Sequence, residues 1–180
     1  AVHEHGIDCK NIDHVTVHTF PFAMQSWFST NEPPLNEVEA ALRTPFAVST
    51  VLIYKNVILE SYVPERINDP EILAMLKKVT VVEEPLFAEN WPDKRRVRLS
   101  IALKNGDTLD LETDNPRGST DYPLSFDDVA AKFSTVVEPL LSKDRIAVVI
   151  ERIGNLEQEK DVPGLIALLS KEPALSLAGE

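Results

Sequence analysis

The sequence predicts an α+β fold: a two-layer sandwich with a roughly four-stranded, mainly antiparallel sheet and helices mostly on one face. Three adjacent features predict it. Residues 96–103 alternate polar and apolar side chains, which is the period of a half-buried strand. Asn105-Gly106 then supplies a tight hairpin turn, and residues 125–137 follow with the apolar spacing of an amphipathic helix. Such a unit becomes stable only when the helix packs on the sheet.

Two further strands are expected before the hairpin. Residues 11–20 carry apolar side chains at Ile12, Val15, Val17 and Phe20, and residues 80–83 form a short β-branched run. Together with the hairpin they make a sheet of about four strands, antiparallel or mixed.

The helices are predicted from caps and prolines. Residues 35–55 read as helix with Asn36 as the cap, but Pro45 interrupts it, so one helix ends near Arg43 and a second begins at Thr44. After an irregular or briefly extended stretch at 57–63, a helix starts at Asp69-Pro70. Three later caps predict three more helices: Ser125, Ser142 and Asp161.

This pattern predicts four segments along the chain. They are the end of a truncated preceding helix (1–10), the α+β domain (11–141), two C-terminal helices (142–171) and a frayed tail (172–180). The absence of an initiating Met adds to the expectation that the chain was trimmed or cut from something longer.

Charge and cysteine content narrow the function classes. The chain has 180 residues and a formal net charge of −11, which argues against nucleic acid and anionic membrane surfaces as partners. It contains no apolar run near 18 residues, so no transmembrane helix is expected. Cys9 is the single cysteine, which excludes an intrachain disulfide and favours the cytoplasm or another reducing compartment.

The densest basic cluster spans residues 94–98. On a strand, Arg96 and Arg98 share one face, so the cluster is interpreted as a solvated sheet face, with an anion or partner contact as the alternative.

The sequence predicts no metal site, no cofactor and no catalytic set. His14 and His18 have the four-residue spacing of a zinc clamp on a helix, but they lie in a predicted strand. Same-face residues there are roughly 13 Å apart at about 3.3 Å per residue, too far to share one metal. His3 and His5 are expected to be exposed residues near the chain end. There is neither a glycine-rich phosphate loop nor a G-x-S-x-G elbow.

An aromatic loop is predicted at residues 21–34. Its large apolar side chains are too many for an idle exposed loop, so they should cover a core, a pocket or a partner surface. They are Phe22, Met24, Trp27 and Phe28.

Several short motifs follow one another along the chain. The most specific run is Lys104-Asn105-Gly106, Pro116-Arg117-Gly118, Tyr122-Pro123-Leu124-Ser125 and Ala131-Lys132-Phe133. Earlier pieces are Gly6-Ile7-Asp8 with Asn11-Ile12, Ala40 to Val48, and Asp69 to Leu73 with Lys78-Val79. In their order and spacing these motifs resemble the C-terminal α+β domain of the MmgE/PrpD family, over about residues 7–170. That family includes 2-methylcitrate dehydratase, cis-aconitate decarboxylase and iminodisuccinate epimerase.

The resemblance implies lyase chemistry on di- or tricarboxylates, with the acid, base and carboxylate-binding groups mostly in a separate helical domain. This domain would supply one wall of the cleft, with Phe22, Met24 and Gln25 near the substrate, or else those residues would simply pack against the helical domain. Arg43 stands where the family usually has serine; it would meet a carboxylate or be a surface change. The expected partner is the helical domain, in cis or in trans, with the carboxylate bound only in the assembled enzyme. The alternative is a stand-alone, non-catalytic binding or dimerisation module, and hence a homodimer.

Overall fold

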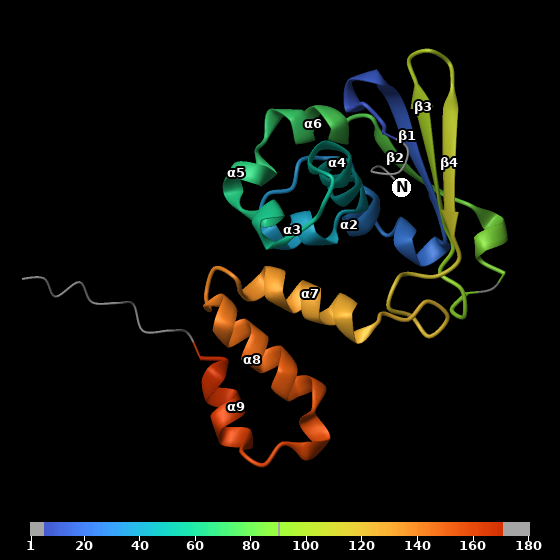
Figure 1. Ribbon diagram of the computed structural model, residues 1–180. Coiled ribbons are helices and arrows are strands. Elements are labelled where there is room, and N and C mark those ends of the chain that lie inside the picture. The colour runs from blue at the N-terminus through green and yellow to red at the C-terminus, as the bar shows by residue number, and fades with distance from the viewer. Residues whose placement is uncertain (1–5, 90, 171–180) are drawn as a thin grey trace, which may run out of the picture. The chain divides into compact units, whose positions relative to one another are not determined.

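The computed structural model describes residues 6–89 and 91–170 and divides the chain into two compact units between Tyr122 and Pro123 (Figure 1). Each unit is described by itself. His3, His5 and the predicted tail at 172–180 lie outside the described residues, as does half of the segment predicted to end a helix at 1–10. The predicted domain boundaries remain a prediction.

The first unit contains a four-stranded sheet in the order β2-β1-β3-β4. Its strands are β1 (Ile12–Thr19), β2 (Val79–Glu83), β3 (Val97–Leu103) and β4 (Thr108–Thr113). β1 pairs with β2 in parallel, whereas β1–β3 and β3–β4 are antiparallel. The predicted α+β class with a mainly antiparallel sheet is therefore confirmed.

The turn between β3 and β4 explains why the hairpin forms where it does. Gly106 has a φ of 93°, a conformation that side chains other than glycine rarely adopt. Its amide donates to the Leu103 carbonyl at 2.9 Å, and the Leu103 amide donates to the Asp107 carbonyl at 2.8 Å.

One face of the sheet forms the main core. Val15, Val79 and Ile101 are completely buried at paired positions of β1, β2 and β3. Leu52 of α4 (Thr44–Tyr54) and Met75 of α6 (Pro70–Leu76) cover this face. In Figure 1 these helices lie on the same side of the sheet.

The predicted break at Pro45 is confirmed. α3 (Glu37–Leu42) ends before Arg43, and α4 begins at Thr44 with Pro45 in its first turn. The Asn36 side chain accepts a hydrogen bond from the Glu39 amide at 2.9 Å, as its role as cap requires. Phe46 at the start of α4 is completely buried in a second cluster with residues from α3, α5 and α6.

Asp69 caps α6 as predicted and also joins it to α4. Its carboxylate accepts from the Glu71 amide at 2.8 Å and from the Tyr54 hydroxyl. This shared hydrogen bond lowers the pKa of Asp69 and raises the pKa of Tyr54.

Short helices occupy segments that the sequence predicts to be irregular. The 21–34 segment contains the 3-10 helix η2 (Pro21–Met24) and α2 (Ser26–Ser29), and Leu59–Tyr62 forms η3 instead of extended chain. Single turns of this length are too short to show a hydrophobic period. The remaining ones are η1 (Cys9–Asn11), α5 (Pro64–Ile67) and η4 (Pro85–Phe87).

The second unit consists of α7 (Phe126–Val137), α8 (Lys143–Gly154), η5 (Leu156–Gln158) and α9 (Val162–Leu168). Ser125 and Asp128 form a capping box at α7, and Asp161 accepts from the Gly164 amide at 3.0 Å. Arg152 donates to Glu159 at 2.6 Å and lowers the pKa of that carboxyl group to about 2.

The three helices leave an apolar groove of about 260 Å³ within this unit. Its lining is Phe126, Val129, Ala130, Phe133, Val149, Ile150, Ile153 and Leu169. No helix among the described residues is both long and apolar enough to span a bilayer.

Candidate functional site

The candidate site lies in the first unit, at the edge of the sheet where the parallel strands β1 and β2 both end. Loops that follow the carboxyl ends of parallel strands commonly build ligand sites, because the strands hold them at one edge. Here the Glu84 amide donates to the Thr19 carbonyl at 2.9 Å, so the two loops start side by side.

An aromatic cluster joins these loops; we define it as Phe20, Phe22, Phe28 and Trp91. The Trp91 ring stacks on Phe20 at 4.4 Å and on Phe22 at 5.9 Å between centroids. Phe22 also contacts Phe28 at 5.9 Å. Phe22 is 51% exposed, so the cluster combines mutual stacking with a face open to a ligand or partner.

The structure places the predicted cleft-wall residues in different settings. Phe22 belongs to the aromatic cluster, whereas Met24 is half-buried against the sheet core. The Gln25 carbonyl accepts from the Phe28 amide at 2.8 Å, and its side chain is half-buried. The guanidinium of Arg43 donates to the Glu32 carbonyl at 2.6 Å and to Glu39 at 2.5 Å. The contribution of these four residues to a substrate cleft remains a prediction.

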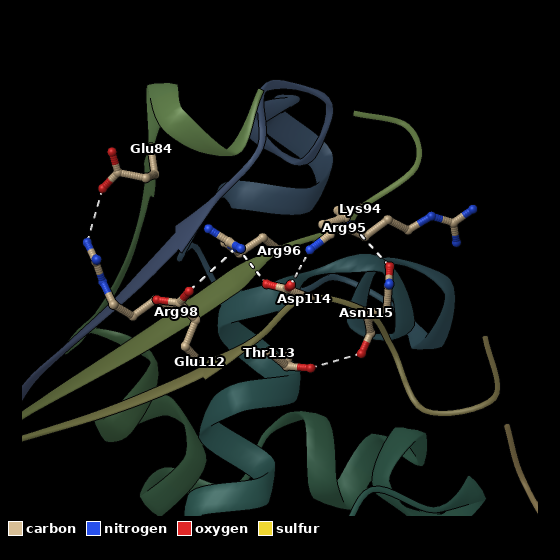
Figure 2. Close-up of polar contacts among 9 residues, drawn as sticks. All are labelled: Glu84, Lys94, Arg95, Arg96, Arg98, Glu112, Thr113, Asp114 and Asn115. Atoms are coloured by element: carbon tan, nitrogen blue, oxygen red, sulfur yellow. Dashed lines mark hydrogen bonds and ion pairs between the residues drawn. The ribbon is translucent and has the colours of Figure 1, made fainter. Parts of the chain in front are cut away.

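The sheet face opposite the core carries paired charges (Figure 2). Asp114 accepts from Arg96 and from Lys94, each at 2.6 Å, and these bonds lower the pKa of its carboxyl group to about 2. Arg98 donates to Glu84 at 3.0 Å. For Arg96 and Arg98 the structure agrees with the solvated-face interpretation of the basic cluster.

A serine, a histidine and a carboxylate also meet on this face. The Ser100 Oγ lies 3.4 Å from His18 Nε2, but the hydroxyl donates to Asp110. Its single hydrogen is therefore directed away from the imidazole, whereas a serine nucleophile must donate to its base. We interpret the row as cross-strand hydrogen bonding. Among the residues that the structure describes, no group of three histidine, cysteine, aspartate or glutamate side chains could hold a metal ion.

A polar pocket of about 410 Å³ lies between the 92–95 loop and the 115–121 loop. Its lining includes Asp93, Arg95, Arg117, Ser119 and Asp121. Sequence reasoning did not single out these residues or Trp91 as site residues. Arg95 could have been recognised from the sequence, because side chains alternate between the two faces of a strand and Arg95 therefore does not share the face of Arg96 and Arg98.

The sequence model of the protein family described as MmgE/PrpD C-terminal domain matches residues 1–158 of the chain. The chain belongs to this family. The matched range contains the whole sheet, the aromatic cluster and the polar pocket of this MmgE/PrpD domain.

Curated relatives point in the same direction. The chain is 24% identical over 151 residues to a protein named cis-aconitate decarboxylase-like protein oryM from Aspergillus oryzae, covering 84% of this chain and 31% of the relative. It is 29% identical over 142 residues to the cis-aconitate decarboxylases of Mus musculus and Homo sapiens, covering 77% of this chain and 28% and 29% of those proteins. The chain thus spans about a third of the length of the relatives it matches.

The family motifs fall at structurally demanding places of this MmgE/PrpD domain. Asn105-Gly106 makes the turn between β3 and β4, and Gly118 has a φ of 95° in the wall of the polar pocket. The segment Tyr122 to Ser125 joins the two units and ends in the cap of α7.

Proposed function

We propose that this domain is part of an MmgE/PrpD-type lyase, 2-methylcitrate dehydratase-like or cis-aconitate decarboxylase-like, that acts on a di- or tricarboxylate. In this proposal the domain supplies one wall of the cleft and is not catalytic alone. The observation that carries it is the family match over residues 1–158, together with relatives named as cis-aconitate decarboxylases.

The chemistry of the reaction supports a second domain. Removing a proton next to a carboxylate requires an acid/base pair and cations that hold the substrate's carboxylates. On the sheet face that the structure describes, the Ser100 hydroxyl donates to Asp110 and not to His18, so the two do not form an acid/base pair, and Arg96 and Arg98 are already paired with carboxylates of this chain. We therefore assign the acid and base to the helical domain of the family, present in cis or in trans.

A surface suited to that domain exists on α3, η3 and α5. Leu35 is 85% exposed, Val38 65% and Leu59 61%, and Val38 and Leu59 line an open, largely apolar groove of about 630 Å³. Exposed apolar side chains at this density favour burial against a partner. The neighbouring carboxylates Glu37 and Glu60 are exposed, so a partner with basic groups around an apolar centre fits best.

Turnover measurements test the proposal. The 180-residue chain alone should neither decarboxylate cis-aconitate nor dehydrate 2-methylcitrate. Supplying a helical domain of the family, in trans or fused before residue 1, should restore one of these activities. Robust turnover by the chain alone would contradict the proposal, and so would failure of every helical domain to bind it.

The alternative function is a stand-alone, non-catalytic binding or dimerisation module. The 59% exposure of Trp27 beside Phe28 favours it, because a second copy could bury that side chain. Sedimentation velocity at micromolar concentrations distinguishes the two. A homodimer that Trp27→Ala dissociates supports the module, whereas a monomer that binds only the helical domain supports the lyase.

We also propose a reducing compartment such as the cytoplasm, supported by the single cysteine in the chain. Imaging of the tagged natural protein tests this, and a signal from an oxidising compartment would contradict it.

A further inference from the structure

The basic stretch 94–98 contains one arginine that differs from its neighbours. Lys94, Arg96 and Arg98 each have a side-chain nitrogen within 3.0 Å of a carboxylate oxygen. Arg95 is exposed, and among the described residues its guanidinium has no carboxylate partner. Figure 2 shows its side chain extending away from Asp114, with its one dashed line at the backbone. Although the chain has a net charge of −11, Arg95 is therefore a cation that can bind a negatively charged group from outside the chain.

Arg95 lines the polar pocket, whose walls are ordered by hydrogen bonds. The Arg95 amide donates to the Asp114 carbonyl at 2.9 Å and so joins the two walls. Within the second wall, Asn115 Nδ2 donates to Asp121 at 2.8 Å and the Gly118 amide donates to the Tyr122 carbonyl at 2.7 Å. The pocket is therefore formed before any ligand arrives, which reduces the entropy that binding would cost.

The lining specifies the ligand chemistry. The planar guanidinium of Arg95 matches carboxylate in a two-bond geometry, and the guanidinium of Arg117, which already has a contact within the chain, adds a second positive charge to the same lining. The same lining contains the carboxylates of Asp93 and Asp121. They repel a ligand with many closely spaced negative charges, and they can accept hydrogen bonds from a ligand hydroxyl. Ser119 adds a buried hydroxyl oxygen without a hydrogen-bond partner among the described groups.

We propose that the pocket between residues 92–95 and 115–121 binds a small hydroxydicarboxylate, with Arg95 on one carboxylate, the positive charge of Arg117 near the other, and Asp93 or Asp121 on the hydroxyl. All its residues belong to this chain. The proposal can therefore fail while the lyase assignment stands, and it can hold without any turnover.

The test is a titration of the ¹⁵N-labelled 180-residue chain with malate, followed by NMR at constant ionic strength. Amides of residues 93–95 and 115–121 should shift and saturate. Succinate, which lacks only the hydroxyl, should bind about threefold or more weakly, and sulfate should not saturate. No saturable shift, or saturation by sulfate at the same concentration, would overturn the carboxylate site; equal binding of succinate would overturn the hydroxylated ligand.

Two matched variants locate the site. Arg95→Gln should weaken malate binding about tenfold, the loss typical of one charge-assisted bidentate contact. Arg98→Gln removes the same charge three residues away, from a side chain bound to Glu84, and should change the affinity less than about twofold. Equal losses in both variants would reduce the effect to general electrostatics and sink the proposal. The spectra of both variants also report whether they are folded.

Discussion

The two faces of the sheet use the same strands in opposite ways. On one face, Val15 and Ile101 are completely buried under α4 and α6. On the other, alternate residues of the same strands, such as His18 and Arg98, carry hydrogen-bonded polar and charged groups that remain partly exposed. The first face holds most of the stability, because burial of apolar area dominates folding whereas exposed ion pairs contribute little. The second face can change its residues at small cost to the fold, so it is the side on which recognition can vary.

The largest expected effect tests the core face. Ile101→Ala should reduce the free energy of unfolding by about 3 kcal/mol, because it leaves a cavity where three strands meet and where α4 cannot fully close. Urea denaturation followed by circular dichroism measures it. A loss below about 1 kcal/mol would break the contrast between the faces, since it would mean that the core repacks freely.

An intermediate effect concerns Asp114 on the charged face. Its pKa of about 2 in the folded chain lies below the ordinary value of about 3.9, so its contribution to stability is complete above pH 4 and disappears as the pH falls toward 2. Arg96→Gln should raise the Asp114 pKa toward the ordinary value, because Arg96 supplies the largest part of the depression. Carboxyl-detected NMR titration measures this. An unchanged pKa would assign the depression to Lys94 instead.

The smallest expected effect sharpens the comparison at adjacent positions. Ser100→Ala, one residue before Ile101 but on the opposite face, should change the free energy of unfolding by no more than about 0.5 kcal/mol, because Asp110 remains exposed to water. The same urea experiment applies. A loss comparable with that of Ile101→Ala would show that the polar row carries structural energy.

The fold was predictable wherever a local rule decided it. Asn36 as a cap, Pro45 as the break between α3 and α4, and Asn105-Gly106 as the hairpin turn each depend on a few neighbouring residues. The strand order was not predictable, because the pairing of Val15 with both Val79 and Ile101 joins residues far apart in the chain. Single-turn helices such as η3 were missed because they are shorter than one hydrophobic period.

The same distinction applies to the candidate site. The aromatic loop was predictable from its composition, since four large apolar residues in a loop need a surface to cover. Its stacking partner Trp91 was not, because that residue arrives from the loop after β2. The polar pocket has a similar origin: Arg95 and Arg117 lie on separate loops that only the pairing of β3 with β4 brings together.

The central position of β1 has a kinetic consequence. Strand β1 hydrogen-bonds on one edge to β2 and on the other to β3, so its first edge can pair only when Glu83 is available and its second only when Leu103 is available. Sheets closed by such distant partners have high contact order and fold slowly compared with helical domains. During synthesis β1 therefore leaves the ribosome with two unpaired edges and an apolar face, and a strand in that state is exposed to aggregation.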